Sequence, residues 1–327
     1  MNQPHERQRA IDLATLSQTP SYQATERVVQ NFQRAKRRAR TEEMLASIRR
    51  LPIDLLAFDH VQARLKLSHK VYQGLQDVPL NKIVGSVNRS DDFTRTFMPR
   101  KDSIQPRWQQ VDRLMNEQGF PPIELYQVSH IYFVRDGHHR VSVAQQEGLE
   151  TIEAHVWAYE SRVPLWADDT SHDIDIRGEY VEFLERTQLD KFRPTPPIIF
   201  MELGCYWALE EEMAIHRYYL GLEQGRDPTF QEAMLDWHDK VYMPLVKAIL
   251  EDELLTYYPG RTVADLALHI IKHQYWLEGQ SQEEEISMAE ATEDFAERLR
   301  RSPWRRLQSW VAHRILGQPI YWPGENN

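Results

Sequence analysis

The sequence has one cysteine and no long hydrophobic run, and each shortage excludes a class of protein. With Cys205 as the single cysteine, an internal disulfide is impossible, so a disulfide-stapled scaffold is excluded and a reducing, cytoplasmic environment is expected. The longest apolar stretch, residues 196–209, contains Glu202 and is too short to span a bilayer. The first residues include no apolar segment, so neither a signal peptide nor membrane association is expected.

An excess of basic residues is also missing. The 327 residues include 39 Lys and Arg against 49 Asp and Glu, a net charge of −10, which argues against nucleic-acid binding by the whole surface. The charge is uneven: residues 1–77 hold 13 basic and 8 acidic side chains, whereas residues 161–327 hold 17 and 30. A hydrophobic content of 41% is ordinary for a globular chain of about two domains.

The N-terminal region is predicted to be helical and locally basic. Residues 24–50 contain no glycine or proline, and apolar residues recur there every three or four positions. A second helix is expected from about residue 59 to residue 75. The first helix carries a basic cluster: Arg34, Lys36, Arg37, Arg38 and Arg40. Within residues 34–50 this cluster would contact nucleic acid such as DNA, contact an acidic lipid, or form a solvated helix face. The last interpretation is favoured because no aromatic residue lies within the cluster to stack on bases.

The middle of the chain alternates between strand and helix patterns. Strands are predicted at residues 79–85, 122–128, 130–135 and 151–157, with a helix start at Ser90, a helix ending at Gly119 and a short helix ending at Gly148. This order is typical of a compact α+β module. Beyond residue 174 the pattern is mostly helical. Helices are predicted at residues 201–224, 230–258, 263–277 and 283–316, after a proline-rich break at residues 194–197.

One short segment carries recognisable chemistry. A predicted strand delivers the chain to Asp136 and Gly137, and a helix begins within the next three residues, His138, His139 and Arg140. The first N–H groups of a helix lack intrahelical partners and the helix dipole is positive there, so such a corner binds phosphate or carboxylate groups readily. The glycine would let the backbone approach a ligand, and the arginine would add a forked cation.

The remaining side chains of this corner suggest further roles. His138 and His139 would donate hydrogen bonds, and His138 would also transfer a proton. Asp136 would hold Mg²⁺ beside a bound phosphate or act as a general base. The corner is not a Walker loop, because GxxxxGK[ST] is absent. The plainer alternative is an ordinary turn and helix cap, and the spacing alone favours the anion site only slightly.

The pattern of residues 78–160, about a quarter of the chain, resembles the ParB/sulfiredoxin superfamily. The similarity rests on VPLNKI at residues 78–83, PPIEL at residues 121–125, YFVRDGHHRVSVA at residues 132–144 and GLETIEA at residues 148–154. ParB proteins have a Gly-Glu-Arg-Arg box that binds a nucleoside triphosphate. Gly137 matches its glycine and Arg140 its second arginine, whereas His138 and His139 replace the other two residues. Arg89 lies in a loop where family members place another phosphate-contacting arginine; a plain surface arginine is the equal alternative.

The resemblance implies a fold and a set of ligands. It implies an α+β chain with a small ParB/sulfiredoxin-like module at residues 78–160, a basic helical region at 1–77, a linker at 161–200 and a mostly α-helical C-terminal domain at 201–327. It also implies binding of ATP, ADP or CTP with Mg²⁺. The Asp-Gly-His-His-Arg form is similar to that of ParB-fold small-molecule kinases, such as the ADP-dependent serine kinases. Sulfiredoxin needs a cysteine at this turn, and Cys205 lies far away in sequence, so sulfinic acid reduction is not expected.

Four functions follow as hypotheses. The first is a nucleotide-binding or phosphate-binding protein, extended to a Mg²⁺-dependent phosphotransferase that acts on a small molecule. The second is a DNA-binding regulator of partition type without catalysis, and the third is a ParB-like nuclease. The fourth is a degenerate fold that is kept as an interaction platform and binds no nucleotide. Elsewhere, His269 and His273 share a helix face with metal-ligand spacing, but no third ligand accompanies them and a structural role is expected.

Overall fold

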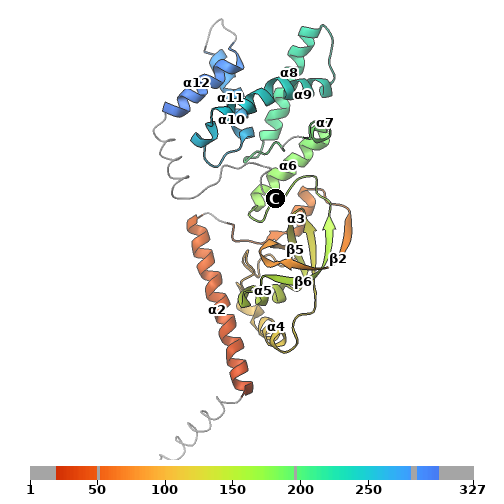
Figure 1. The fold of residues 1–327 in the computed structure, drawn as a ribbon, viewed down its shortest axis with the longest axis vertical. Helices are drawn as coiled ribbons and strands as arrows, with labels where there is room; N and C mark the ends of the chain where they lie inside the picture. The colour runs from red at the N-terminus through yellow and green to blue at the C-terminus, as the bar shows by residue number, and fades with distance from the viewer. Residues whose placement is uncertain (1–19, 50–51, 195–196, 281–285, 302–327) are drawn as a thin grey trace, which may run out of the picture. The chain divides into compact units, whose positions relative to one another are not determined.

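A six-stranded mixed sheet is the centre of the N-terminal half of the chain (Figure 1). The computed structural model describes residues 20–49, 52–194, 197–280 and 286–301, which divide into one compact unit up to Ile174 and a second from Asp175. The sheet has the order β1-β3-β5-β4-β6-β2. Its strands are β1 (Leu56–Ala57), β2 (Lys70–Pro79), β3 (Ile83–Ser86), β4 (Ile123–Val128), β5 (Ile131–Asp136) and β6 (Thr151–Tyr159).

The strand pairing combines local hairpins with distant partners. β4 and β5, both predicted as strands that follow each other closely, form an antiparallel hairpin that turns at Ser129 with a positive φ of 54°. β3 lies parallel to β5, and β4 lies parallel to β6. At one edge the short β1 runs parallel to β3, and at the other edge β2 runs antiparallel to β6. The carboxyl ends of β3 and β5 therefore meet at the same edge of the sheet, which is where ligands are commonly bound in α/β structures.

Helices cover the two faces of this sheet unequally. The helices of the unit are α2 (Pro20–Arg49), α3 (Phe58–Arg64), α4 (Gln105–Gln118) and α5 (His138–Glu147). Ile123, Leu125, Ile152, Ala154 and Val156 share the core with residues of α2, α4 and α5, as the alternation of the strands predicts. On the other face, Phe58 of α3 packs against Tyr126, Phe133 and Tyr159 at ring-centroid distances of 4.8 to 5.4 Å.

The N-terminal helix is part of this core. Phe32 of α2 meets Trp108 of α4 edge-on, with ring centroids 5.5 Å apart, and both rings are fully buried. Asn31 donates hydrogen bonds to Asp112 and Glu147, and Lys36 pairs with Asp102 at 2.6 Å. Polar bonds at these positions fix the register of the helix on its neighbours.

Two predictions for this unit are wrong. The helix expected over residues 59–75 ends at Arg64, and residues 70–79 form strand β2, so the boundary expected at residue 77 falls inside a strand. Gly74 weakens a helix, and pairing with β6 gives the segment a ladder instead. The helix start expected at Ser90 is absent: the chain turns there and makes isolated bridges through Phe93 and Thr94.

The second unit is helical, as predicted, but begins earlier than expected. The segment 161–200, expected to be a linker, contains α6 (Ser171–Thr187) and α7 (Leu189–Phe192). The other helices are α8 (Cys205–Gln224), α9 (Phe230–Trp237), α10 (Met243–Glu251), α11 (Val263–Glu278) and α12 (Met288–Arg301), with a π-helical turn at His238–Tyr242. The predicted helix at 283–316 lies partly outside the described residues.

Aromatic packing forms part of the core of the second unit. The buried ring of Tyr206 stacks on Tyr180 at 5.0 Å and meets Phe200 edge-on at 4.9 Å. The Tyr206 hydroxyl donates a 2.7 Å hydrogen bond to the carbonyl of Ile198, which satisfies its one polar atom. None of the helices in the described part of the chain has the length and apolar character needed to cross a membrane.

Candidate functional site

The predicted corner between β5 and α5 is present. β5 ends at Asp136, Gly137 adopts a left-handed conformation with φ 104° and ψ 20°, and α5 starts at His138. The first intrahelical hydrogen bond runs from the N–H of Val141 to the carbonyl of Gly137. The three preceding N–H groups, those of His138, His139 and Arg140, have no intrahelical acceptor and form the positive end of the helix dipole.

Gly137 is required by packing as well as by backbone conformation. A Cβ at this position would lie 2.5 Å from Cγ2 of Ile123 and 3.1 Å from Nε of Arg140. The first of these distances is shorter than any ordinary carbon contact, and Ile123 is fully buried in the core. The space that a side chain at position 137 would occupy is therefore already filled by Ile123 and Arg140.

The Arg140 side chain pairs with protein groups at the corner instead of extending toward solvent. Its Nη1 donates to the carbonyls of Pro121 and Pro122 at 2.9 and 2.8 Å, and its Nη2 pairs with Oδ2 of Asp136. The arginine side chain is 17% exposed, whereas that of Asp136 is 68% exposed. The structure thus links both residues to the loop that enters β4, and it gives Arg140 three partners within the protein.

His138 turns inward and is held by a neighbouring strand end. Its Nε2 lies 2.8 Å from Oγ of Ser86, the last residue of β3, and the same hydroxyl accepts the backbone N–H of Arg89 at 3.2 Å. Burial, with the nearby charge of Arg89 as a second cause, lowers the pKa of His138 to about 4. The imidazole is therefore neutral at neutral pH and can donate one hydrogen bond and accept another.

His139 lies in a similar field. Burial, followed by the charges of Arg89 and Arg107, lowers its pKa to about 4. Its Nδ1 is buried and has no hydrogen-bond partner among the described residues. Phe93 holds both imidazoles, parallel to the His138 ring at 6.5 Å and edge-on to the His139 ring at 5.6 Å. A buried polar atom without a protein partner is uncommon, and a ligand or a water molecule at this position would satisfy it.

The loop after β3 supplies the cation of the site. The Arg89 side chain is about half exposed and lies 4.0 Å from Oδ2 of Asp92, whose other carboxylate oxygen forms a 2.9 Å ion pair with Lys101. Arg89 lies close enough to both histidines to lower their pKa values. The structure thus brings Arg89 to the same corner as Gly137, His138 and His139.

Four residues of this neighbourhood were missed by the sequence analysis: Ser86, Phe93, Lys101 and Arg107. Ser86 could have been found, because it ends a strand that is parallel to β5 and adjacent to it. The other three come from loops and a helix start whose paths the sequence does not indicate. Among the described residues, no cluster of three or more His, Cys, Asp or Glu side chains could hold a metal ion, so Asp136 is not part of such a cluster there.

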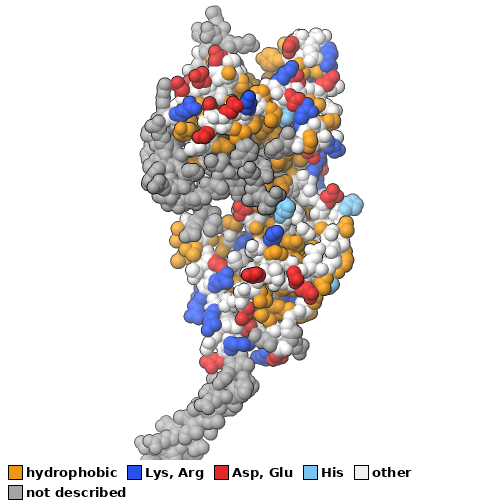
Figure 2. All heavy atoms as spheres, viewed as in Figure 1, with side chains coloured by type: hydrophobic (Ala, Val, Ile, Leu, Met, Phe, Trp, Pro, Cys, Tyr) orange, Lys and Arg blue, Asp and Glu red, His pale blue; other side chains and the backbone are white. Residues whose placement is uncertain are grey.

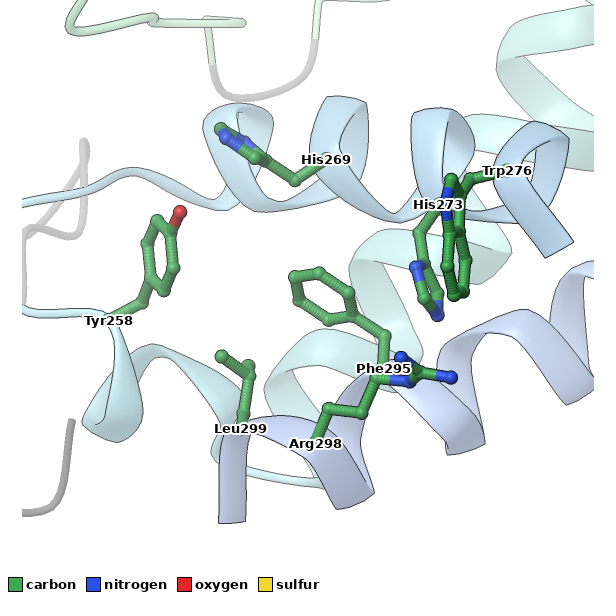
Figure 3. A pocket seen from close by; sticks show the side chains of 7 residues that line it. All are labelled: Tyr258, His269, His273, Trp276, Phe295, Arg298 and Leu299. Carbon is green, nitrogen blue, oxygen red and sulfur yellow. The ribbon is translucent and has the colours of Figure 1, made fainter. Parts of the chain in front are cut away.

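A separate pocket lies in the helical unit (Figure 3). It measures about 280 Å³ and is lined by Tyr258, His269, His273, Trp276, Phe295, Arg298 and Leu299. The two histidines that share a helix face point to different partners: Nδ1 of His269 lies 2.7 Å from the carbonyl of Asp265, and Nε2 of His273 lies 2.7 Å from Oδ2 of Asp294. Arg298 also pairs with Asp294 and covers the ring of Trp276. Of these contacts, the His273–Asp294 pair and the Arg298–Trp276 contact join α11 to α12.

Comparison with known proteins returns a structural likeness for part of the chain. No family model and no curated protein matches the sequence. Among solved structures, sulfiredoxin from Arabidopsis thaliana matches 26% of this chain and 86% of its own, at 23% sequence identity and a TM-score of 0.20. The predicted α+β architecture is present: a mixed six-stranded sheet with helices, and a helical C-terminal region. The chemical properties of the corner between β5 and α5 are those of its own residues, and the likeness to sulfiredoxin adds none.

Proposed function

We propose that the N-terminal unit binds a nucleotide through its phosphate groups at the start of α5. The observation that carries this proposal is the convergence of unpaired helix N–H groups, two neutral imidazoles and the Arg89 guanidinium on one corner. The helix end and the guanidinium offer hydrogen-bond donors and positive potential to an anion, and the neutral imidazole of His139 offers a donor in the tautomer that carries its proton on Nδ1.

Arg89, and not Arg140, is the direct phosphate contact in this proposal. Arg140 already donates to two backbone carbonyls and an acidic side chain, so its charge is largely compensated. Arg89 has a long ion pair at 4.0 Å and a half-exposed side chain, and it can reorient toward a ligand at little cost. Arg140 then acts as a positioning residue that holds Gly137 and the helix start in place.

The two histidines are proposed to bind rather than to transfer protons. An imidazole with a pKa of about 4 is deprotonated at neutral pH and is a weak base, so it serves poorly as a general acid or base there. As a neutral group, His139 could direct its unpartnered Nδ1 to a phosphate hydroxyl or a bridging water. A bound phosphate dianion would raise both pKa values.

Magnesium would enter with the nucleotide. Mg²⁺ commonly uses one or two carboxylates together with substrate phosphates, and Asp136 supplies one exposed carboxylate beside the helix start. Phosphoryl transfer to a small acceptor is the reaction that such an arrangement would support, because positioning and electrostatics supply most of that catalysis. Its assay is the appearance of ADP or AMP from ATP or ADP when candidate hydroxyl acceptors are added.

Calorimetric titration of the full chain with ATP, ADP and CTP, with and without Mg²⁺, tests the binding proposal. Arg89→Ala should weaken binding about 10-fold to 100-fold, the value of one hydrogen bond to a charged group. Arg113→Ala is the matched control: it removes the same charge from an exposed position on α4 and should change affinity less than about twofold. Wild-type protein that binds none of the three nucleotides would contradict the proposal, as would equal losses in both variants.

A second candidate, DNA binding through α2, is favoured by one specific observation. Arg34, Arg37 and Arg40 are exposed on the outer side of this helix and form no ion pair within the described residues, whereas Lys36 is buried against Asp102. Figure 2 shows basic side chains gathered along this side of the unit. These three arginines would bind a polyanion with an affinity that falls as the salt concentration rises.

A gel-shift series on duplex DNA at increasing salt tests this second candidate. Replacement of Arg34, Arg37 and Arg40 by Gln should remove any shift, while Arg38→Gln, at a residue already paired with Glu42, serves as the control. Incubation of plasmid with Mg²⁺ or Mn²⁺ separates simple binding from a nuclease. A shift that survives the triple substitution would contradict the role of α2.

A further inference from the structure

β2 is an edge strand of the sheet, and most of its residues are exposed. β2 is the last strand in the sheet order and pairs with β6 alone; within the described residues no strand occupies its other side (Figure 1). An edge strand presents a row of unpaired N–H and C=O groups and readily pairs with another chain unless it is shortened or charged. This strand is ten residues long, and its counterpart at the other edge, β1, has two.

Apolar side chains accompany this open edge. Val71, Tyr72 and Leu75 are 63, 52 and 49% exposed. Tyr72 also extends the aromatic row of the sheet, with its ring 5.2 Å from Trp157 and its hydroxyl 2.7 Å from Nδ1 of His155. Large apolar groups on a long open edge are the features that favour association of sheets across strands.

An irregularity at Gln73 decides which side chains share a face. The ladder pairs Tyr72 with Trp157 but Gly74 with Val156, so Gln73 is an extra residue. Beyond this bulge Leu75 lies opposite His155, on the same face as Tyr72. By the same register Lys70 and Asp77, opposite Tyr159 and Glu153, also lie on that face. Without the bulge, residues seven positions apart would lie on opposite faces.

We propose that β2 pairs in antiparallel fashion with β2 of a second copy of this chain, about a two-fold axis between Gln73 and Gly74. In this register Lys70 lies opposite the partner's Asp77, and Tyr72 lies opposite the partner's Leu75. The symmetry repeats both pairs, so the interface contains two charge pairs and two aromatic–aliphatic pairs. The six-stranded sheet of each copy becomes half of one continuous sheet.

Charge complementarity selects this partner and this register. Asp77 is exposed, and it forms no ion pair among the described residues. Lys70 donates a 3.3 Å hydrogen bond to the Tyr126 hydroxyl and lies over the ring of that tyrosine, which leaves its charge without a carboxylate in the described part of the chain. A shift by two residues in either direction would place Lys70 opposite Leu75 or Pro79 and would lose both charge pairs. A strand that is complementary to itself in charge and in apolar groups fits a second copy better than an unrelated peptide.

Charge exchange tests the pairing directly. Sedimentation velocity of the full wild-type chain across the micromolar range should show a monomer–dimer equilibrium. Lys70→Asp alone and Asp77→Lys alone each create two like-charge pairs, and each should weaken the dimer by at least about tenfold. An equimolar mixture of the two variants should dimerise again. In the mixed dimer the carboxylate introduced at position 70 of one variant faces the ammonium introduced at position 77 of the other, and the native pair remains on the other side of the axis.

Two control variants and three results that would overturn the proposal complete this test. Lys247→Asp and Glu251→Lys make the same charge changes at an exposed pair on α10 and should leave the dimer unchanged. Circular dichroism establishes that each variant is folded. A wild-type chain that stays monomeric overturns the proposal, and so does a dimer that survives both single variants. A mixture that fails to dimerise also overturns it, because the two variants are complementary only in the proposed register.

Discussion

Replacement of Gly137 by alanine should destabilise the N-terminal unit more than the same substitution of the other glycine that flanks α5. The left-handed backbone at φ 104° costs an L-residue on the order of 1–2 kcal/mol. The added Cβ would also lie 2.5 Å from Cγ2 of Ile123, a side chain that is fully buried and cannot move aside freely. Overpacking of this kind costs about 1–3 kcal/mol, so the expected total is about 2–5 kcal/mol.

Gly148, at the other end of the same helix, isolates the packing contribution. It too has a left-handed backbone, at φ 75° and ψ 28°, but no atom lies within 4 Å of the position that a Cβ would take. Gly148→Ala should therefore cost only the backbone contribution, about 1–2 kcal/mol. The two variants share the type of substitution, the helix and the sign of φ, and they differ in the contact with Ile123.

Urea unfolding of the full chain, followed by far-UV circular dichroism, measures both costs. Gly137→Ala should lower the free energy of unfolding by about 1–3 kcal/mol more than Gly148→Ala. Combining Gly137→Ala with Ile123→Ala, which removes the Cγ2 that the new Cβ would meet, should cost less than the sum of the two single substitutions. Equal losses for the two glycine variants would refute the reasoning that the glycine serves packing at the corner.

Two further predictions concern the histidines and the helix core. The pKa of His138 is about 4 in the folded chain against an ordinary value of 6.5, so the unfolded chain binds more protons between these two pH values. The free energy of unfolding should therefore rise with pH from about 4 to about 6.5 and then level off. In urea titrations at a series of pH values, His138→Gln should reduce that rise by on the order of 3 kcal/mol. Ser142→Ala should lower the free energy of unfolding by about 1–3 kcal/mol, because Nε1 of Trp108 donates a 2.8 Å hydrogen bond to the Ser142 hydroxyl and both residues are fully buried. Ser142→Thr keeps the hydroxyl and is the comparison. An unchanged urea midpoint for Ser142→Ala would contradict the importance of this hydrogen bond.

The sequence indicated the strands of the sheet wherever one face is buried. Residues 122–128 and 151–157 alternate because Ile123, Leu125, Ile152, Ala154 and Val156 all face the same core, and this regularity is visible without knowledge of any partner. The hairpin of β4 and β5 was visible for the same reason and because its strands are adjacent in the chain. Local patterns predict local pairing well.

Long-range pairing explains the error at β2. Only Val78 near its end and the partly buried Gly74 and Pro79 contact the interior, so the segment carries little alternation to mark it as a strand. Its partner β6 lies about eighty residues further along the chain, and the bulge at Gln73 breaks the period of two. A strand with both an exposed face and an interrupted period is difficult to distinguish from a polar helix by composition alone.

The corner shows the same division between local and distant information. The turn at Gly137 and the start of α5 follow from neighbouring residues, and both were predicted. The partners of Arg140 were not, because a guanidinium near a helix start is equally suited to a ligand phosphate and to backbone carbonyls. The carbonyls of Pro121 and Pro122 lie at the entry to β4, and only the antiparallel pairing of β4 with β5 brings them within reach.

The different surroundings of Arg140 and Arg89 bear on what the proposed site can do. The guanidinium of Arg140 is held by protein groups, so its position is fixed and its charge is largely compensated. The half-exposed guanidinium of Arg89 lies on a loop and can reorient toward a ligand. Burial is the largest cause of the low pKa values of His138 and His139, and Arg89 is the first of the charges that lower them further. Removal of Arg89 should therefore raise both histidine pKa values part of the way toward their ordinary range even without ligand, so binding energy and histidine titration should respond to the same substitution.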